Sequence, residues 1–189
     1  RLEEQPWDPA MTIIVDTRVA AHIGSGPEST LEWVLSLGAS LATELLRDRL
    51  RVSLLGADGV IFRPINGEST GAAARLLATV TDVEPSGRAF LEDCLADPDA
   101  LGTARTVVAG LGLLHSRDAA ALVAATARVA DIDALVPDAR AFRLPADVVV
   151  AHEKACRLLT TSGWNVATFG PEATVPQGWG RLVAQREAR

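Results

Sequence analysis

Short apolar runs alternate with longer amphipathic segments along most of this 189-residue chain. Runs of a few apolar residues indicate buried strands, and apolar residues recurring at helical spacing indicate helices that bury one face. A strand, a helix and a further strand in succession force a right-handed parallel crossover. The sequence therefore predicts a three-layer α/β domain of about six strands, with a mostly parallel sheet between two layers of helices.

Six segments are predicted to be strands. They are residues 11–15, 52–55, 60–65, 105–110, 138–144 and 164–169. The run at 105–110 is almost wholly apolar, as expected of a central parallel strand. Only a few residues join 52–55 to 60–65, so we expect these two strands to pair as an antiparallel hairpin.

Helices are predicted between these strands, and several have recognisable end signals. The expected segments are residues 30–47, 69–83, a shorter helix ending near 96, 117–129, 147–161 and 176–183. Ser29 and Glu32 have the spacing of a capping box. Ser116 and Asp147 are expected to cap the helices that follow them, and Gly163 is expected to supply a left-handed stop.

Composition limits the classes of function. The net charge is −6 and the basic residues are scattered, so nucleic acid is not an expected partner. The longest apolar run, 107–114, is far too short to span a bilayer, so we expect no membrane contact by this segment itself. Cys94 and Cys156 stand alone, which argues against structural zinc and fits a reducing compartment.

We expect one domain over residues 1–189, with 1–10 as an extended lead-in. The chain begins with Arg1 rather than Met, and its opening carries no start signal. We therefore expect it to be a piece of a longer protein. Its 48% hydrophobic content suits a single domain with a substantial core.

Asp16 directly follows the first predicted strand, which is where chemistry is expected. Ligand sites in open α/β sheets lie just past the carboxyl ends of strands. A carboxylate there can hold a metal, act as a nucleophile or base, or accept backbone N–H groups of its own turn. Residue 18 is Arg18 rather than a second acid, which favours the turn-capping interpretation.

Two further motifs are incomplete. Gly24-Ser-Gly26 and Gly110-Leu-Gly112 each match part of a phosphate-binding loop but lack its third glycine, so no dinucleotide cofactor is expected. Asp16, Cys156 and the only lysine, Lys154, are the residue types of an isochorismatase-type hydrolase. Lys154 and Cys156 would lie on different faces of one helix, so the three cannot converge.

A family resemblance covers nearly the whole chain. The stretches Glu3-Glu-Gln-Pro-Trp7, Ile13-Ile-Val-Asp-Thr-Arg18 and Gly26-Pro-Glu-Ser-Thr-Leu-Glu-Trp33 resemble the C-terminal half of actinobacterial proteins of the domain-of-unknown-function 58 family. The resemblance implies a von Willebrand factor A-like domain with a Rossmann-like sheet and the hairpin strand as its antiparallel edge. It also implies a MoxR-type AAA+ ATPase as partner. Upstream transmembrane segments would hold the domain in the cytoplasm, at the inner face of the membrane.

Such domains bind Mg²⁺ at a metal-ion-dependent adhesion site, and the resemblance implies where its positions fall here. Asp16 matches the first aspartate, Arg18 replaces the first serine of Asp-x-Ser-x-Ser, and Ser86 falls near the threonine position. Gly112 lies in the stretch where the last aspartate is absent, and Thr17 lies beside Asp16. With one carboxylate and one hydroxyl the site is degenerate, and we expect it to hold no metal. Arg18 can instead pair with Asp16.

We therefore expect a non-catalytic protein-interaction module without cofactors. Residues 16–29, 85–87 and 112–116 would contact the partner, around the adhesion-site positions Asp16, Thr17, Arg18, Ser86 and Gly112. Two alternatives stay open. One is a small-molecule hydrolase that uses Asp16 with Cys156 or Ser86, and the other is a metal-dependent binding module.

Overall fold

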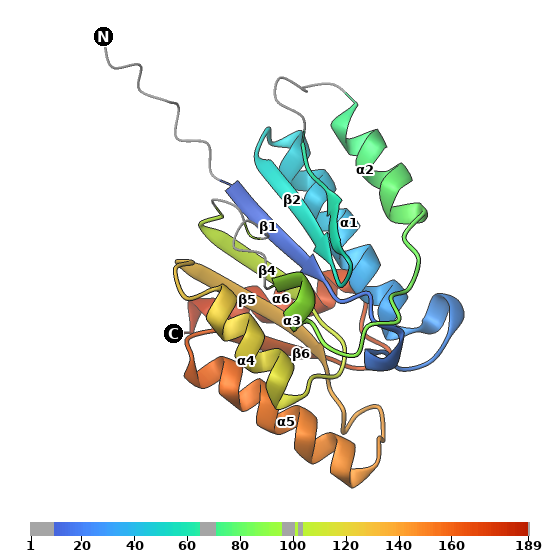
Figure 1. Ribbon diagram of the computed structural model, residues 1–189, viewed down its shortest axis with the longest axis vertical. Coiled ribbons are helices and arrows are strands. Elements are labelled where there is room, and N and C mark those ends of the chain that lie inside the picture. Colours follow the sequence, from blue (N-terminus) through green and yellow to red (C-terminus); the bar gives the residue numbers. More distant parts are fainter. Residues whose placement is uncertain (1–9, 65–70, 96–100, 102–103, 189) are drawn as a thin grey trace.

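One six-stranded sheet organises the protein, as the computed structural model shows for residues 10–64, 71–95, 101 and 104–188. The strand order is β3-β2-β1-β4-β5-β6 (Figure 1). The strands are β1 (Ala10–Val15), β2 (Arg51–Gly56), β3 (Gly59–Phe62), β4 (Thr106–Gly110), β5 (Asp131–Pro137) and β6 (Asn165–Phe169). All neighbours pair in parallel except β3, which runs antiparallel to β2. The predicted fold class and hairpin are confirmed.

Helices cover both faces of the sheet, which makes the fold a three-layer, Rossmann-like one. The first face carries α1 (Thr30–Arg47), α2 (Ala72–Thr81) and α6 (Val175–Glu187), and the second carries α3 (Glu92–Leu95), α4 (Ser116–Ala125) and α5 (Ala146–Thr161). Two 3₁₀ turns, η1 (Val19–Ala21) and η2 (Gly26–Glu28), lie between β1 and α1.

Side-chain alternation along the strands divides the core in two. Ile13 and Val15 of β1 pack with residues of α1, whereas Ile14, between them, packs with residues of α4 and α5. Successive side chains of a strand point to opposite faces, so a strand that is covered on both faces needs an unbroken apolar run. This is why the run at 11–15 forms an inner strand.

The predicted strand at 138–144 is wrong. These residues form a turn in which Asp138 Oδ1 accepts hydrogen bonds from the backbone N–H groups of Arg140 and Ala141, at 3.0 and 3.1 Å. The strand is β5, which starts at Asp131. Its acidic residues are neutralised by Arg186 of α6, whose Nη1 lies 3.2 Å from Asp133 Oδ2.

Two predicted helix caps are also wrong. Ser116 is the first residue of α4, and His115 is its N-cap. The N-cap of α5 is Pro145, and Asp147 lies within the first turn. The left-handed stop at Gly163 is confirmed, with φ of +97°.

Several helix bounds differ from those expected. α1 has the predicted bounds, whereas α4 ends at Ala125 rather than 129 and α6 continues to Glu187 rather than 183. The expected strand end at Ile65, helix start at Ser69 and helix end near Ala96 lie outside the described residues, as does most of the 1–10 lead-in. In the described part of the chain, no helix combines the length and apolarity needed to cross a bilayer.

Candidate functional site

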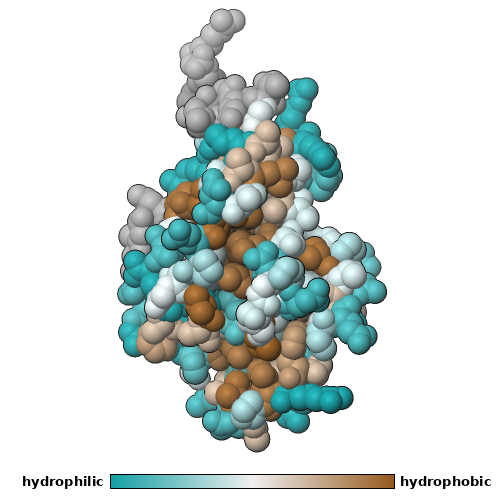
Figure 2. Space-filling view, turned by 90° about the vertical axis from the view of Figure 1, so that its right-hand side faces the viewer, coloured by the Kyte–Doolittle hydropathy of each residue, from teal (hydrophilic) through white to brown (hydrophobic). Residues whose placement is uncertain are grey.

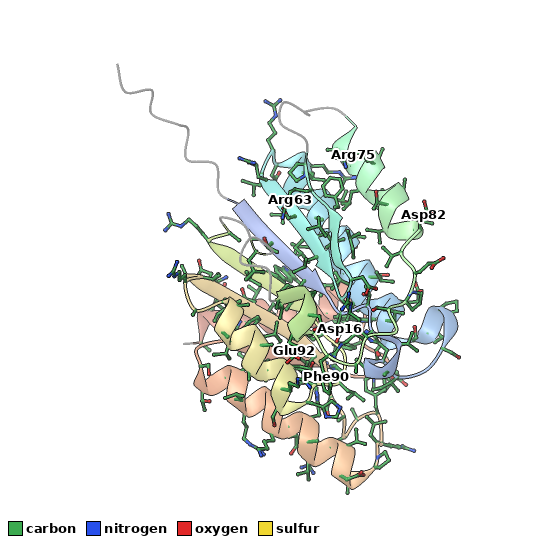
Figure 3. The ribbon with its side chains drawn as sticks, viewed as in Figure 1. Asp16, Arg63, Arg75, Asp82, Phe90 and Glu92 are labelled. Atoms are coloured by element: carbon green, nitrogen blue, oxygen red, sulfur yellow. The ribbon has the colours of Figure 1, made fainter. Side chains whose placement is uncertain are left out.

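The carboxyl ends of β1 and β4 lie at the point where the strand order reverses. From β1 the chain passes through α1 to β2 on one side, and from β4 it passes through α4 to β5 on the other. Open α/β sheets bind ligands in the crevice at such a switch point. Asp16 follows β1 here (Figure 3), and Gly112 follows β4.

A buried arginine fills this crevice. The Nε and Nη2 atoms of Arg18 donate to the two carboxylate oxygens of Asp16 at 2.8 and 2.7 Å. Its Nη1 donates to Asp118 Oδ1 at 2.9 Å and to the carbonyl oxygen of Ala89 at 3.1 Å. Arg18 is 1% exposed and both aspartates are fully buried. The predicted pairing of Arg18 with Asp16 is confirmed, and Arg18 also bridges to a second acid.

Backbone N–H groups hold both carboxylates in place. Asp16 accepts from the N–H groups of Arg18 and Gly112, each at 3.2 Å. Asp118 accepts from those of Leu91 and His115, each at 3.0 Å. Every carboxylate oxygen in the network therefore has a donor, which is the condition under which buried charges are tolerated.

The charged form of Arg18 is stabilised by Asp16 and Asp118. Burial disfavours the charged guanidinium, but the hydrogen bonds and negative charges of Asp16 and Asp118 outweigh it and raise the pKa of Arg18. The group is therefore a permanent cation between two acids.

This arrangement does not fit a magnesium site. Mg²⁺ requires several oxygen ligands in octahedral geometry. Arg18 instead brings a positive group within 2.9 Å of both carboxylates and uses their oxygens. Among residues 10–64, 71–95, 101 and 104–188, no three His, Cys, Asp or Glu side chains are grouped so that they could hold a metal ion.

Thr17 and Ser86 join two loops beside the network. The N–H of Ser86 donates to the carbonyl oxygen of Thr17 at 2.7 Å, and the N–H of Val19 donates to that of Ser86 at 2.9 Å. The hydroxyl of Thr17 accepts from the N–H of Ala57, and that of Ser86 from the N–H of Arg88. Both residues are buried and serve the packing of the loops.

Gly112 allows the loop after β4 to approach η1 closely. A Cβ atom at this position would lie 2.4 Å from the carbonyl oxygen of Ala21. The N–H of Gly112 donates to Asp16, and that of Leu113 donates to Ala21. The amides of this partial phosphate-loop motif are thus used within the protein.

The structure therefore gathers all five predicted adhesion-site positions, and all five are buried. Their exposed or half-buried neighbours, which we call the crest, are Val19, Ala20, Ala89, Leu113 and His115. Sequence reasoning missed Asp118, which completes the network. The local signal for Asp118 is its position three residues after the helix N-cap, which the structure places at His115 rather than at the expected Ser116.

Four of the five crest residues, all except Val19, line a small, mainly apolar pocket of about 310 Å³. Ala20, Leu113 and Val148 line it, with Arg18 and Asp147 as its charged members. Beside it, Arg117 of α4 lies over the ring of Phe90, 4.2 Å from the centroid, and forms an ion pair with Glu92.

Cys156 lies near His152, but the geometry does not make it a nucleophile. His152 Nδ1 accepts from the N–H of Leu114 at 3.0 Å, so Nε2 carries the proton and donates to the carbonyl oxygen of Pro137. The imidazole has no free lone pair to take the thiol proton, although Nε2 lies 3.5 Å from the sulfur. Burial raises the pKa of Cys156 to about 12. The cavity that Cys156 lines, about 380 Å³, is not lined by Asp16.

In comparisons with known proteins, no family model and no curated protein matches this chain.

Proposed function

We propose that this domain is a non-catalytic protein-interaction module that docks a protein partner on the crest without a metal ion. The observation that carries the proposal is the buried Arg18, which is salt-bridged to Asp16 and Asp118 at the switch point of the sheet. The guanidinium of Arg18 lies between the carboxylates of Asp16 and Asp118, so the crevice is not available for metal-mediated contact.

The crest has the properties of a preformed docking surface. Its three loops are fixed by the Arg18 network and the backbone bonds around Ser86, so little conformational freedom is lost on binding. Val19 is 58% exposed and directly precedes Ala20, which lines the apolar pocket. Figure 2 shows hydrophobic patches separated by hydrophilic residues on the side of the molecule seen there.

The family resemblance supplies a partner for this proposal. We propose that the crest binds a MoxR-type AAA+ ATPase, and that the domain is placed at the inner face of the membrane by segments outside this chain. The resemblance to the domain-of-unknown-function 58 family is the support for both statements.

The test is an affinity capture of a purified MoxR-type ATPase on the immobilised domain. Val19→Asp places a charge on the crest at an exposed position and is expected to weaken capture at least about tenfold, as loss of a central apolar contact does. Val60→Asp on β3 is the matched control, because Val60 is 48% exposed and lies on the edge strand.

Equal capture by the wild type, Val19→Asp and Val60→Asp would refute the crest as the docking surface. Loss of capture in both variants would also count against it, because the effect would then not be specific to the crest. Circular dichroism of each variant verifies that the fold is retained.

A further inference from the structure

A second cavity, of about 530 Å³, lies at the carboxyl end of β6 and has an aromatic wall. It is bounded by the start of α1, the start of α6 and the loop that follows β6. Trp33, Phe142 and Phe169 provide the wall. Neither the Arg18 network nor the crest lines this cavity, so it is a separate site.

The aromatic wall is held rigidly. Trp33 stacks on Phe169 with ring centroids 3.8 Å apart and planes 8° from parallel, and Phe142 meets Phe169 edge-on at 6.4 Å. The indole Nε1 of Trp33 donates to the carbonyl oxygen of Ala173 at 2.6 Å. A Cβ atom at Gly178 would lie 2.7 Å from the indole, so glycine is required for this packing. The wall is therefore preformed, as ligand sites usually are.

Three exposed carboxylates line the same cavity: Glu28, Glu32 and Glu172. Within the part of the chain that the structure describes, none of them forms an ion pair with a basic side chain. α1 and α6 both begin here, and each helix N-terminus contributes only about half a positive charge. The three acids outweigh the two helix ends, so the net charge of the cavity is negative.

We propose that this cavity receives an arginine side chain of the docked protein partner. The inference rests on the proposed function, since the arginine belongs to that partner. The aliphatic stem of an arginine packs along an apolar wall while its charged head meets carboxylates. A guanidinium is planar, weakly hydrated and forked, so it fits an aromatic surface with acids at its rim better than an ammonium does. The partner segment is thus basic, which complements the domain's net charge of −6.

The test uses N-acetyl-arginine-amide as probe, so it needs no partner protein. The indole N–H resonance of Trp33 is followed in the ¹⁵N-labelled domain, and Trp33→Phe identifies it among the four tryptophans. We expect a saturable shift of this resonance with the arginine probe. N-acetyl-citrulline-amide has nearly the same shape without the charge, and we expect it to leave the resonance in place.

Variants of the glutamates that line the cavity then test whether these carboxylates bind the arginine probe. Glu32→Gln and Glu172→Gln are each expected to weaken the arginine probe about two- to fivefold, the range for exposed ion pairs. The hydrogen bond that caps α1 runs from the backbone N–H of residue 32 to the Ser29 hydroxyl, so Gln at position 32 retains it. Glu187→Gln at the other end of α6 is the matched control and is expected to leave binding unchanged.

Three outcomes would overturn the inference: no shift with the arginine probe, an equal shift with citrulline, or unchanged binding in both Gln variants. Tighter binding of spermidine than of the arginine probe would also overturn it, by indicating a free polyamine site. None of these results bears on capture through Val19, so the two proposals fail separately.

Discussion

Removal of the Arg18 guanidinium is expected to destabilise the domain strongly. Arg18→Met keeps most of the side-chain volume but removes four hydrogen bonds, two to Asp16, one to Asp118 and one to the carbonyl oxygen of Ala89. It also leaves two fully buried carboxylates without a counter-charge.

The expected cost follows from that geometry. Breaking a buried ion pair by removing one partner costs about 3–5 kcal/mol, because the remaining charge is buried and unpaired. Four backbone N–H bonds to the carboxylates survive the substitution, which places the loss of unfolding free energy toward the lower end, at about 3–4 kcal/mol. For a domain of this size that is a fall in melting temperature of about 6–16 °C.

Urea denaturation followed by circular dichroism measures this loss. Repeating the measurement at several pH values separates the effect of the unpaired charges from the effect of lost packing. In Arg18→Met the unpaired buried carboxyls take up protons more readily when folded than when unfolded. The folded variant then binds more protons, so its deficit relative to the wild type is expected to shrink as pH falls from 7 to 5.

Two controls complete the experiment. Arg128→Met removes an exposed arginine and is expected to change stability by less than about 0.5 kcal/mol. The triple variant Asp16→Asn/Arg18→Met/Asp118→Asn removes all three charges and is expected to recover much of the loss. A deficit below about 1 kcal/mol for Arg18→Met would refute the reasoning. A deficit that does not change with pH would refute it equally.

Two further predictions concern the surroundings of the network. Burial is the main cause that lowers the pKa of both His22 and His152 below the ordinary 6.5, so the unfolded chain binds more protons near that pH. Their contribution to stability is complete above pH 6.5 and is lost as pH falls below it. The urea midpoints of unfolding at pH 7.5 and pH 5.5 measure this loss of stability. His152→Asn should reduce the difference between the two midpoints, and an unchanged difference would exclude His152 as its source. Gly112→Ala is expected to cost at least about 1–3 kcal/mol through overpacking against Ala21, whereas Gly87→Ala meets open space and should be nearly neutral in the same assay. Equal effects of the two glycine variants would contradict the close approach of the loops.

The sequence predicted those elements whose signals are local. α1 has the predicted bounds because its capping residue Ser29 and its apolar periodicity act within one segment. The β2–β3 hairpin was predicted because a short connection permits only antiparallel pairing.

The fifth strand was predicted at the wrong residues because β5 depends on contacts with residues that are distant in the sequence. β5 contains Asp131 and Asp133, which are poor strand residues until Arg186 and Asn165 pair with them from 32 to 55 residues away. The turn at 138–144 mimics the alternation of a strand, but the Asp138 carboxylate holds its backbone in place.

The candidate site was predicted in part. Asp16 and Arg18 are two residues apart, so their pairing follows from the strand end. Asp118 lies 100 residues from Arg18 and meets it only because α4 starts at the switch point of the sheet. A long-range contact of this kind follows from topology and leaves no local pattern.

We infer that the buried Arg18 cation, paired with Asp16 and Asp118, excludes a divalent metal from the end of β1. A thermal melt of the wild-type domain in increasing Mg²⁺, with Mn²⁺ in parallel, tests it most directly. A native-state site filled a hundredfold above its Kd adds about 2.7 kcal/mol of stability. We predict that millimolar Mg²⁺ or Mn²⁺ leaves the melting temperature unchanged. A rise that grows with the logarithm of metal concentration and disappears in Asp16→Asn would contradict the claim.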